Sequence, residues 1–468
     1  MLFRSAAKVT LLINLVFKID VICQFHTSLN FSATRQGTCR SLIQKPAEQE
    51  TDMRGVHITN EIGHLKAVLV HRPGAETQNY PDADFSQVFS LRKWSGRFDL
   101  DKAMYEHNSM VRLLEKHGVE TIEIRDLLED SLETEPQSLK FFIDDYLRCS
   151  GATGREFLEA ITQLFESAKN TQELVNIVLN GIRFGDTELC SNQSETLRAL
   201  VHEQFDPASL LVNPLNTLFF TRDPAVVVGD GIILNHMYWP ERDREVALYR
   251  QIFTHHKIMG ETPVCDLNRS SYHIEGGDIL VISAKTILVG ISDRTEPAAV
   301  ESLAKELLTS NKFQTTELIA IRVPSDGLRI HLDTFISRID HDAFLIDREI
   351  CNAVDAYSIQ LKRSGKGLTI TPIDRTIPEI LSAACCEPIK VIDCGGGNQT
   401  AYERERRNNA TSILALSPGK LCVYEENVWT NEALEKAGME LFPLSIDELT
   451  KGYGGTNCLC LPLWREDL

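Results

Sequence analysis

One arrangement recurs along this chain and constrains its fold more than any other feature: a strand hairpin followed by a helix and a further strand. Apolar runs interrupted by turn residues predict hairpins over 225–234, 278–292 and 412–424. Further strands are predicted over 317–323, 343–347 and 389–393, with a helix over 296–309. This alternation indicates an α/β fold of similar units, although sequence identity between the units is too faint to define a repeat.

The alternation starts at the beginning of the ordered part, which we expect near Gly55. A buried strand is predicted over 65–71, where an apolar run ends in a proline–glycine turn. A helix follows over 102–116, with an apolar stripe at helical spacing, and Gly118 ends it. The pattern then returns to a strand over 119–124.

Residues 127–208 interrupt this alternation, because their apolar residues follow helical spacing. Thr153 and Glu156 form a capping box at the start of one predicted helix. Thr171 and Ser194 are candidate N-caps of two further helices. We therefore predict an all-helical insertion domain that divides the catalytic part of the chain into two segments, 54–126 and 209–468.

Residues 1–53 are predicted to form a leader outside the fold. Residues 1–45 carry six basic side chains against one acid, Asp20, which is typical of an organellar targeting peptide. A secretory signal is the alternative, because residues 9–17 are mostly apolar, although Lys18 closes that run. We expect a mitochondrion or related organelle, with a cytoplasmic or secreted location as the alternative. No stretch is long enough to span a bilayer.

Composition narrows the classes of function. The chain has 468 residues and a formal net charge of −18, which argues against nucleic-acid binding because that requires a basic surface. The twelve cysteines show no regular spacing, which favours reduced thiols in an intracellular enzyme over a disulfide framework. His255 and His256 have no matching Cys or His spacing, so no metal site is predicted.

A cysteine near the end of the sequence is the first candidate for chemistry. Cys458 follows Gly454 and Gly455, and such a glycine pair forms a tight loop that can present a thiol. A free cysteine is more often a small buried hydrophobic residue, and that interpretation stays open for Cys458 taken alone. Three other stretches strengthen the functional hypothesis: Phe220–Asp223, His273–Asp278 and His331–Thr334.

Together these stretches supply a thiol, an imidazole and three carboxylates: Cys458, His331, Glu275, Asp223 and Asp333. Each residue has a structural alternative, because an aspartate before proline can start a turn and a lone histidine is more often a core residue. His331 and Asp333 alternate, so both would face the same way in an extended segment. As a set, these groups suit nucleophilic attack on a planar, cationic carbon.

The four stretches resemble those of the arginine deiminases, members of the guanidine-modifying enzyme superfamily. The resemblance runs from about Gly55 to Leu468 and includes His71–Gly74, Met237–Pro240 and the helical insertion with Leu174–Arg183. It implies a five-bladed, pseudo-symmetric propeller of ββαβ modules. It also implies hydrolysis of free L-arginine to L-citrulline and ammonia, the first step of arginine catabolism by the arginine dihydrolase pathway.

The same resemblance implies a role for each site residue. Cys458 would be the nucleophile, His331 the general acid and base, and Glu275 the carboxylate beside it. Asp223 and Asp333 would bind the guanidinium. The implied substrate contacts are Arg242 and Arg294 for the α-carboxylate, Phe220 beside the guanidinium, and Asn216 or Thr217 for the α-amino group. Tyr453 departs from the family pattern, which often has arginine five residues before the nucleophile.

The implied mechanism passes through a covalent amidino-cysteine and requires no metal or organic cofactor. L-Arginine is the implied small-molecule partner, without nucleic acid or membrane, and a homodimer or homotetramer is expected. Three alternatives stay open: a deiminase acting on another guanidino compound, an amidinotransferase, and an inactive arginine-binding protein. Arg242 and Arg294 favour free arginine, because agmatine and peptidyl-arginine lack a free α-carboxylate.

Overall fold

The computed structural model describes residues 55–79, 98–134, 136–190, 197, 205–325, 327, 329–351 and 355–468. The chain divides into two units, Met1–Asp52 and Met53–Leu468, and the second contains all the described residues. The predicted leader and most of the helix predicted after Ser194 lie outside them. Among the described helices, none is long and apolar enough to cross a bilayer.

Five sheets in the described part of the chain share one plan: two antiparallel strands, then a third strand parallel to the second. Their strands are β5 (Ala225–Val228), β6 (Gly231–Leu234) and β7 (Val264–Asp266); β8 (Ile279–Ser283), β9 (Thr286–Ile291) and β10 (Glu317–Arg322); β11 (Ile336–Asp340), β12 (Ala343–Ile346) and β15 (Lys390–Asp393); β16 (Leu414–Ser417), β17 (Lys420–Tyr424) and β18 (Glu440–Leu444); and β19 (Leu461–Arg465), β1 (Leu65–Val70) and β2 (Glu120–Glu123).

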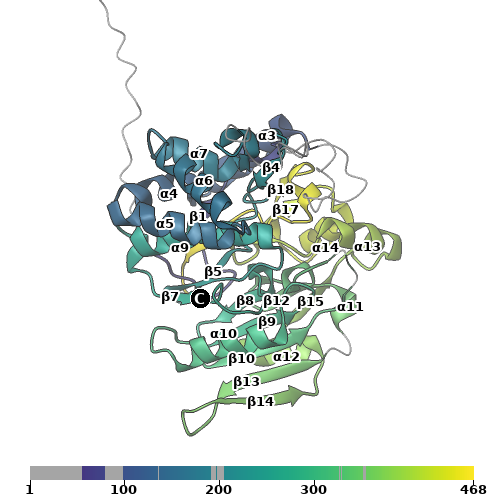
Figure 1. Ribbon diagram of the computed structural model, residues 1–468. Helices are drawn as coiled ribbons and strands as arrows, with labels where there is room; N and C mark the ends of the chain where they lie inside the picture. The colour runs from purple at the N-terminus through teal and green to yellow at the C-terminus, as the bar shows by residue number, and fades with distance from the viewer. Residues whose placement is uncertain are drawn as a thin grey trace, which may run out of the picture. The chain divides into compact units, whose positions relative to one another are not determined.

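A helix lies between the second and third strand of each sheet, because parallel neighbours need a crossover connection. These helices are α3 (Leu100–Lys116), α9 (Pro240–His255), α10 (Pro297–Thr309), α12 (Ile377–Cys385) and α14 (Val428–Lys436). Asp99 caps α3 by accepting from Lys102 N, and proline opens α9 and α10. The predicted alternation of hairpins, helices and strands is confirmed, and the protein is an α/β protein with mixed sheets (Figure 1).

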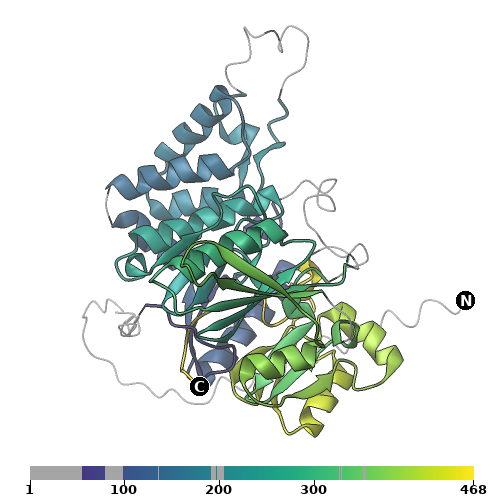
Figure 2. The same cartoon turned by 90° about the horizontal axis from the view of Figure 1, so that it is seen from below.

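The region between β2 and β5 is mainly helical. Its helices are α4 (Ile124–Glu133), α5 (Pro136–Cys149), α6 (Arg155–Glu166) and α7 (Thr171–Asn180). They lie together in Figures 1 and 2, and α4 and α5 pack against α9. The apolar side chains of this region and of β5 and β6 form one continuous hydrophobic core, so the helices are fixed to the sheets by burial of apolar surface.

Three details of this helical region differ from the prediction. Gly154, rather than Thr153, is the N-cap of α6, and Asn170 caps α7 by accepting from Glu173 N. The helix α6 therefore begins one residue later than the sequence suggests. The helix α7 begins one residue earlier, because asparagine is at least as good an N-cap as threonine. The third difference is that β3 (Ile182–Arg183) and β4 (Leu210–Val212) pair antiparallel. The insertion is therefore not all-helical, because two residues of strand leave no recognisable period.

One sheet extends beyond the common plan. β13 (Ala356–Leu361) pairs antiparallel with both β10 and β14 (Leu368–Ile373), which lie at the edge of this sheet in Figure 1. The sequence does not predict either strand. Most side chains of β14 are exposed on both faces, so the segment lacks the alternation of apolar and polar residues that marks a half-buried strand.

Short helices occupy several of the connections. They are η2 (Ala75–Thr77), η3 (Phe184–Asp186), η5 (Met259–Glu261), η6 (Gly276–Asp278), η7 (Leu332–Thr334), α11 (Arg348–Cys351), α13 (Gln399–Glu405), η8 (Arg406–Asn408) and η9 (Leu449–Gly452). Two of them, η6 and η7, lie just before the first strands of their sheets. These two turns carry or adjoin side chains of the candidate site.

Candidate active site

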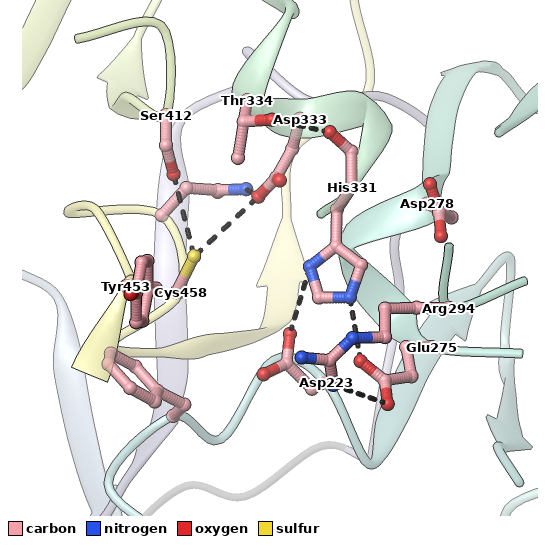
Figure 3. A network of polar contacts seen from close by, with 12 residues as sticks. Asp223, Glu275, Asp278, Arg294, His331, Asp333, Thr334, Ser412, Tyr453 and Cys458 are labelled. Atoms are coloured by element: carbon pink, nitrogen blue, oxygen red, sulfur yellow. Dashed lines mark hydrogen bonds and ion pairs between the residues drawn. The ribbon is translucent and has the colours of Figure 1, made fainter. Parts of the chain in front are cut away.

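Each of the five sheets presents polar side chains from the segment just before its first strand. The side chains are Asp223 before β5, Glu275 before β8, His331 and Asp333 before β11, Ser412 before β16, and Cys458 before β19. Each of these residues is at most 5% exposed. Figure 3 shows them gathered around one another, so residues that are far apart in the sequence form one buried polar centre.

The loop that carries Cys458 is shaped by two glycines. A Cβ on Gly454 would lie 2.1 Å from the Phe220 ring, and a Cβ on Gly455 would lie 2.6 Å from Ser412 Cβ. Glycine at both positions therefore lets the loop approach these two side chains closely. As a result, Cys458 Sγ lies 3.5 Å from Ser412 Oγ and 3.8 Å from Asp333 Oδ2.

The surroundings of Cys458 favour the neutral thiol. Burial raises its pKa well above the ordinary value, and the carboxylates of Asp333 and Asp223 raise that pKa further. The thiolate is the reactive form of cysteine. A positive charge placed near these carboxylates would offset their effect and would favour that form.

Two carboxylate oxygens of this centre, Asp223 Oδ1 and Asp333 Oδ1, are buried without a hydrogen-bond partner in the described part of the chain. The other oxygen of each group is bonded: Arg242 Nη1 donates to Asp223 Oδ2 at 2.7 Å, and Asn457 Nδ2 donates to Asp333 Oδ2 at 3.0 Å. Burial raises the pKa of Asp333. Because unpartnered buried acceptors are costly, these two oxygens fit a ligand with N–H donors and positive charge.

His331 lies between two carboxylates. Its Nε2 is 2.7 Å from Glu275 Oε2, and its Nδ1 is 3.8 Å from Asp223 Oδ1. Burial lowers the pKa of His331, but the bond to Glu275 and the charge of Asp223 overcome this and raise it to about 9. For Glu275, burial alone would raise the pKa, but Arg294 and His331 lower it to about 2. The pair is therefore an imidazolium and a carboxylate at neutral pH.

Asp278 fixes the segment that carries His331. Its Oδ1 accepts from Leu332 N at 2.8 Å, and its Oδ2 accepts from the hydroxyls of Ser292 and Thr295 at 2.6 Å each. Burial raises the pKa of Asp278 to about 6. No feature of the sequence distinguishes Asp278, although this residue closes the stretch that contains Glu275.

The two arginines implied as α-carboxylate ligands lie at the more exposed side of the centre, with side chains 12% exposed. Arg242 donates to Asp223 Oδ2 at 2.7 Å and to Glu245 Oε2 at 2.8 Å. Arg294 Nη1 is 3.5 Å from Glu275 Oε1, and its guanidinium lies 5.2 Å from the centre of the Tyr238 ring. Each arginine is thus already paired with a carboxylate.

Two further residues implied as substrate contacts, Phe220 and Asn216, are both buried. The Phe220 ring fills the space left by Gly454 and lies 4.5 Å from the Phe219 ring, centre to centre. Asn216 is 6% exposed, and its Nδ2 has no hydrogen-bond partner in the described residues. A buried amide nitrogen without a partner among these residues is able to donate to an acceptor on a ligand.

Tyr453, which replaces the arginine frequent at this position in the family, has an unusual backbone. Its φ of 71° is rare for a residue with a side chain. Its carbonyl accepts from Asn409 Nδ2 at 2.5 Å. The hydrogen bond ties the end of η9 to the segment before β16, and so it helps to fix the start of the loop that carries Cys458.

In two of the site stretches the backbone departs from a simple alternation of side chains. His331 and Asp333 do not share one face of an extended segment, because η7 begins directly after His331 and turns Asp333 toward the centre. His273 alternates with Glu275 in the sequence but does not join the centre. Its Nδ1 lies 2.9 Å from Met237 O, and its ring packs against Tyr238.

The arrangement can support nucleophilic chemistry on a cation. It offers a thiol, an imidazolium 2.7 Å from a carboxylate, and two carboxylate oxygens without partners among the described residues. No group of three or more His, Cys, Asp or Glu side chains in the described residues is placed to hold a metal ion.

Comparisons with known proteins agree with this chemistry. A model of the arginine deiminase family matches residues 94–465. The chain is 33% identical over 422 residues to arginine deiminase of Clostridium perfringens (strain SM101), covering 89% of this chain and 100% of that protein. It is 34% identical over 417 residues to arginine deiminase of Streptococcus equi subsp. zooepidemicus (strain MGCS10565), covering 88% and 98%.

A solved structure supports the fold. SxtG, an amidinotransferase from Microseira wollei in the saxitoxin biosynthetic pathway, superposes with a TM-score of 0.50 at 14% sequence identity, covering 88% of this chain and 98% of that one. At this identity the likeness concerns the fold alone, an α/β fold of the amidinotransferase type. With the family match and both close relatives taken together, the chain belongs to the arginine deiminase family.

Proposed function

We propose that this protein hydrolyses free L-arginine to L-citrulline and ammonia through a covalent amidino-cysteine on Cys458. The observation that carries this proposal is that Asp223 Oδ1 and Asp333 Oδ1 are buried and have no hydrogen-bond partner among the described residues. Asp333 also contacts the Cys458 thiol. A guanidinium is planar, permanently charged and rich in N–H donors, so two carboxylates match it closely. The reaction is the first step of arginine catabolism by the arginine dihydrolase pathway.

Binding of the guanidinium prepares the nucleophile. The cation enters between Asp223 and Asp333 and offsets the two negative charges that raise the pKa of Cys458. The thiol then releases its proton to solvent water, and the thiolate lies close to the cationic carbon. The substrate thereby supplies the positive charge that stabilises the thiolate.

The chemistry then follows in two halves. The thiolate attacks the guanidinium carbon and forms a C–S bond. His331 donates its proton to one terminal nitrogen, the C–N bond breaks, and ammonia leaves an amidino-cysteine cation. In the second half, neutral His331 takes a proton from water, and the water oxygen bonds to the same carbon. The C–S bond breaks, and the added hydroxyl passes its proton to the departing thiolate as the citrulline carbonyl forms, which restores the Cys458 thiol.

Recognition of the other end of the substrate favours free arginine. Arg242 and Arg294 lie at the more exposed side of the centre and would bind the α-carboxylate, while Asn216 or Thr217 would contact the α-amino group. Phe220 would pack against the guanidinium. Agmatine and peptidyl-arginine have no free carboxylate for the two arginines, so both should be poor substrates.

The proposal is tested by measuring ammonia and citrulline from arginine, agmatine and a peptidyl-arginine. Transfer of the amidino group to an added amine is measured in parallel, because an amidinotransferase would form a new guanidino compound. Quenched wild-type protein should carry an amidino adduct on Cys458. The Cys458→Ser variant should lose turnover and keep its fold, and Cys460→Ser is the matched control. An adduct on Cys460, or activity in Cys458→Ser, would contradict the proposal.

We also propose that the five sheets are the blades of a five-bladed ββαβ propeller around the active site, with segments 54–126 and 209–468 forming the catalytic part and 127–208 an inserted domain. The shared plan of the sheets and the equivalent positions of their site residues support this arrangement. A crystal structure of the protein with citrulline tests it. A sheet that lies away from an axis common to the other four would contradict it.

We propose that residues 1–53 direct the protein to a mitochondrion or related organelle. Within them, residues 1–45 carry six basic side chains and one acid, which supports this because targeting peptides have such a composition. Fused to a fluorescent reporter, residues 1–53 should carry it to the organelle, and a protein starting at Met53 should keep full activity. A reporter that stays cytosolic, or that is secreted and glycosylated at Asn30, would overturn the targeting proposal.

We propose, finally, that the enzyme is a homodimer or homotetramer without nucleic-acid or membrane partners. The acidic net charge of −18 supports the absence of a nucleic-acid partner. Light scattering coupled to size-exclusion chromatography measures the molar mass directly. A monomer at micromolar concentration would contradict this proposal and would leave the proposed reaction untouched.

A further inference from the structure

Four of the five segments that precede a first strand carry residues with a role in the proposed reaction, and the fifth carries Ser412. Ser412 precedes β16 by two residues, as Asp223 precedes β5 by two. It is 3% exposed, and its hydroxyl points to the nucleophile in Figure 3. The equivalence of position suggests that this segment also contributes to the chemistry.

The contact between Ser412 and Cys458 is specific. Ser412 Oγ lies 3.5 Å from Cys458 Sγ, and this is the one hydrogen bond of that hydroxyl within the described residues. The sulfur also lies 3.8 Å from Asp333 Oδ2. A carboxylate can accept a proton from the thiol but cannot donate one to the thiolate. A hydroxyl can do both.

The backbone of Ser412 is held from two directions. Its carbonyl accepts from Thr456 Oγ1 at 3.0 Å, which joins it to the loop that carries Cys458. The preceding residue, Thr411, donates from its side chain to Thr334 O, which joins it to the segment of His331 and Asp333. The Ser412 hydroxyl therefore comes from a segment that is hydrogen-bonded both to the Cys458 loop and to the segment of His331 and Asp333.

We propose that Ser412 is a positioning residue that donates a hydrogen bond to the Cys458 thiolate and holds the sulfur in line with the substrate carbon. This inference rests on the proposed function, because it assigns the thiolate as nucleophile. The hydroxyl stabilises the charged sulfur directly. The ionisable groups that face the sulfur are Asp333 and Asp223, and both disfavour its negative charge. Before the substrate binds, Ser412 therefore stabilises the thiolate form of Cys458, which the two carboxylates destabilise.

The test measures the ionisation of Cys458 without any turnover. Substrate-free, full-length protein is alkylated with iodoacetamide across a pH series, and modification of Cys458 is followed by mass spectrometry. In Ser412→Ala the apparent pKa of Cys458 should rise by about one unit, because a hydrogen bond to a charged group is lost. The turnover number for arginine should fall about tenfold to a hundredfold, and KM should change less than about threefold.

Two further variants separate this role from a structural one. Ser412→Thr keeps the hydroxyl and should keep the alkylation profile of the wild type. Ser337→Ala removes a buried serine that donates to Thr411 O and does not touch the sulfur, so it should leave the profile unchanged. Ser337→Ala is the matched control for loss of a nearby buried hydrogen bond.

The outcomes distinguish the two proposals. An unchanged alkylation profile in Ser412→Ala, or an equal shift in Ser337→Ala, would overturn the role of Ser412. A shift confined to Ser412→Ala would support it even if wild-type protein did not convert arginine. In that case the proposed function would fail, and the hydrogen bond between Ser412 and Cys458 would stand.

Discussion

The buried and the more exposed halves of the active site differ in how their charges are matched. In the buried half, Asp223 and Asp333 each keep one oxygen without a hydrogen-bond partner among the described residues. In the exposed half, Arg242 and Arg294 already face Glu245 and Glu275. In the described residues, the buried half therefore holds carboxylate oxygens that accept no hydrogen bond. The exposed half holds guanidinium groups that are paired with carboxylates before any ligand binds.

This difference indicates where binding free energy is gained. A cation that enters the buried half satisfies acceptors that were desolvated at a cost, so its pairing with them is strong. An α-carboxylate that reaches the arginines has to share them with Glu245 and Glu275. Its net contribution is smaller, because bonds are exchanged rather than added. The guanidinium end should therefore govern catalysis, and the carboxylate end should govern selectivity.

The largest expected effect comes from Asp333→Asn in the buried half. This change leaves a substrate guanidinium with one carboxylate and costs about 3–5 kcal/mol of transition-state stabilisation, so kcat/KM should fall by at least about a hundredfold. Citrulline formation at varied arginine concentrations measures it. Asp342→Asn, an exposed carboxylate bonded to Lys390, is the control. If kcat/KM falls less than about fivefold in Asp333→Asn, the buried carboxylates do not govern catalysis as proposed.

The next effect concerns pH. In the wild type, His331 keeps its proton below a pKa of about 9, so kcat/KM should decline as the pH rises through that value and the acid is lost. Glu275→Gln removes the charge that raises this pKa, so the decline should move to lower pH by about two units. The α-amino group of the substrate titrates identically in both proteins. A decline at the same pH in both would show that His331 is not the acid.

In the exposed half, Arg294→Ala should raise KM for arginine more than it lowers kcat. Loss of one charge-assisted bond costs about 1.5–3 kcal/mol, which corresponds to about tenfold to a hundredfold. The preference for arginine over agmatine should narrow by a similar factor. Arg322→Ala, which removes a mostly exposed arginine, serves as the control. An unchanged preference in Arg294→Ala would mean that Arg294 does not touch the α-carboxylate.

The smallest effect is expected for Asn216→Ala. Loss of a neutral hydrogen bond to the substrate costs about 0.5–1.5 kcal/mol, so KM should rise by about two- to tenfold. The melting temperature should not fall, because the change removes an amide nitrogen that is buried without a partner among the described residues. If KM is unchanged and the melting temperature falls, the amide has a structural role and does not meet the substrate.

The sequence locates much of this site, because its residues lie in short polar stretches next to apolar strands. Cys458 after its glycine pair and Glu275 before another are recognisable from local composition. The positions of the main hairpins follow from the same contrast. The fold class could be predicted for that reason, whereas β14 could not, because it is exposed on both faces.

Residues whose importance depends on a distant partner could not be found this way. No sequence pattern around Ser412 indicates a functional role. The role is inferred from its contact with Cys458, which precedes a strand of another sheet. Asp278 is likewise identified by its bond to Leu332 N. The pairing of Arg242 with Glu245 was accessible in principle, since the two residues are three apart on one helix. The structure adds that Arg242 also donates to Asp223. A substrate carboxylate would therefore compete with two carboxylates for Arg242.

The strand order of the sheet that contains β1 has a consequence for folding during translation. β19 pairs with β1, with Leu69 opposite Leu461, although nearly the whole described chain separates them. During synthesis, β1 must wait without its partner until β19 leaves the ribosome, and pairings of such long range form slowly. Cys458 lies just before β19, so a nascent chain holds the carboxylates and the imidazole long before it holds the thiol. Catalytic competence should therefore arrive in one step, once β19 has been synthesised and has paired with β1.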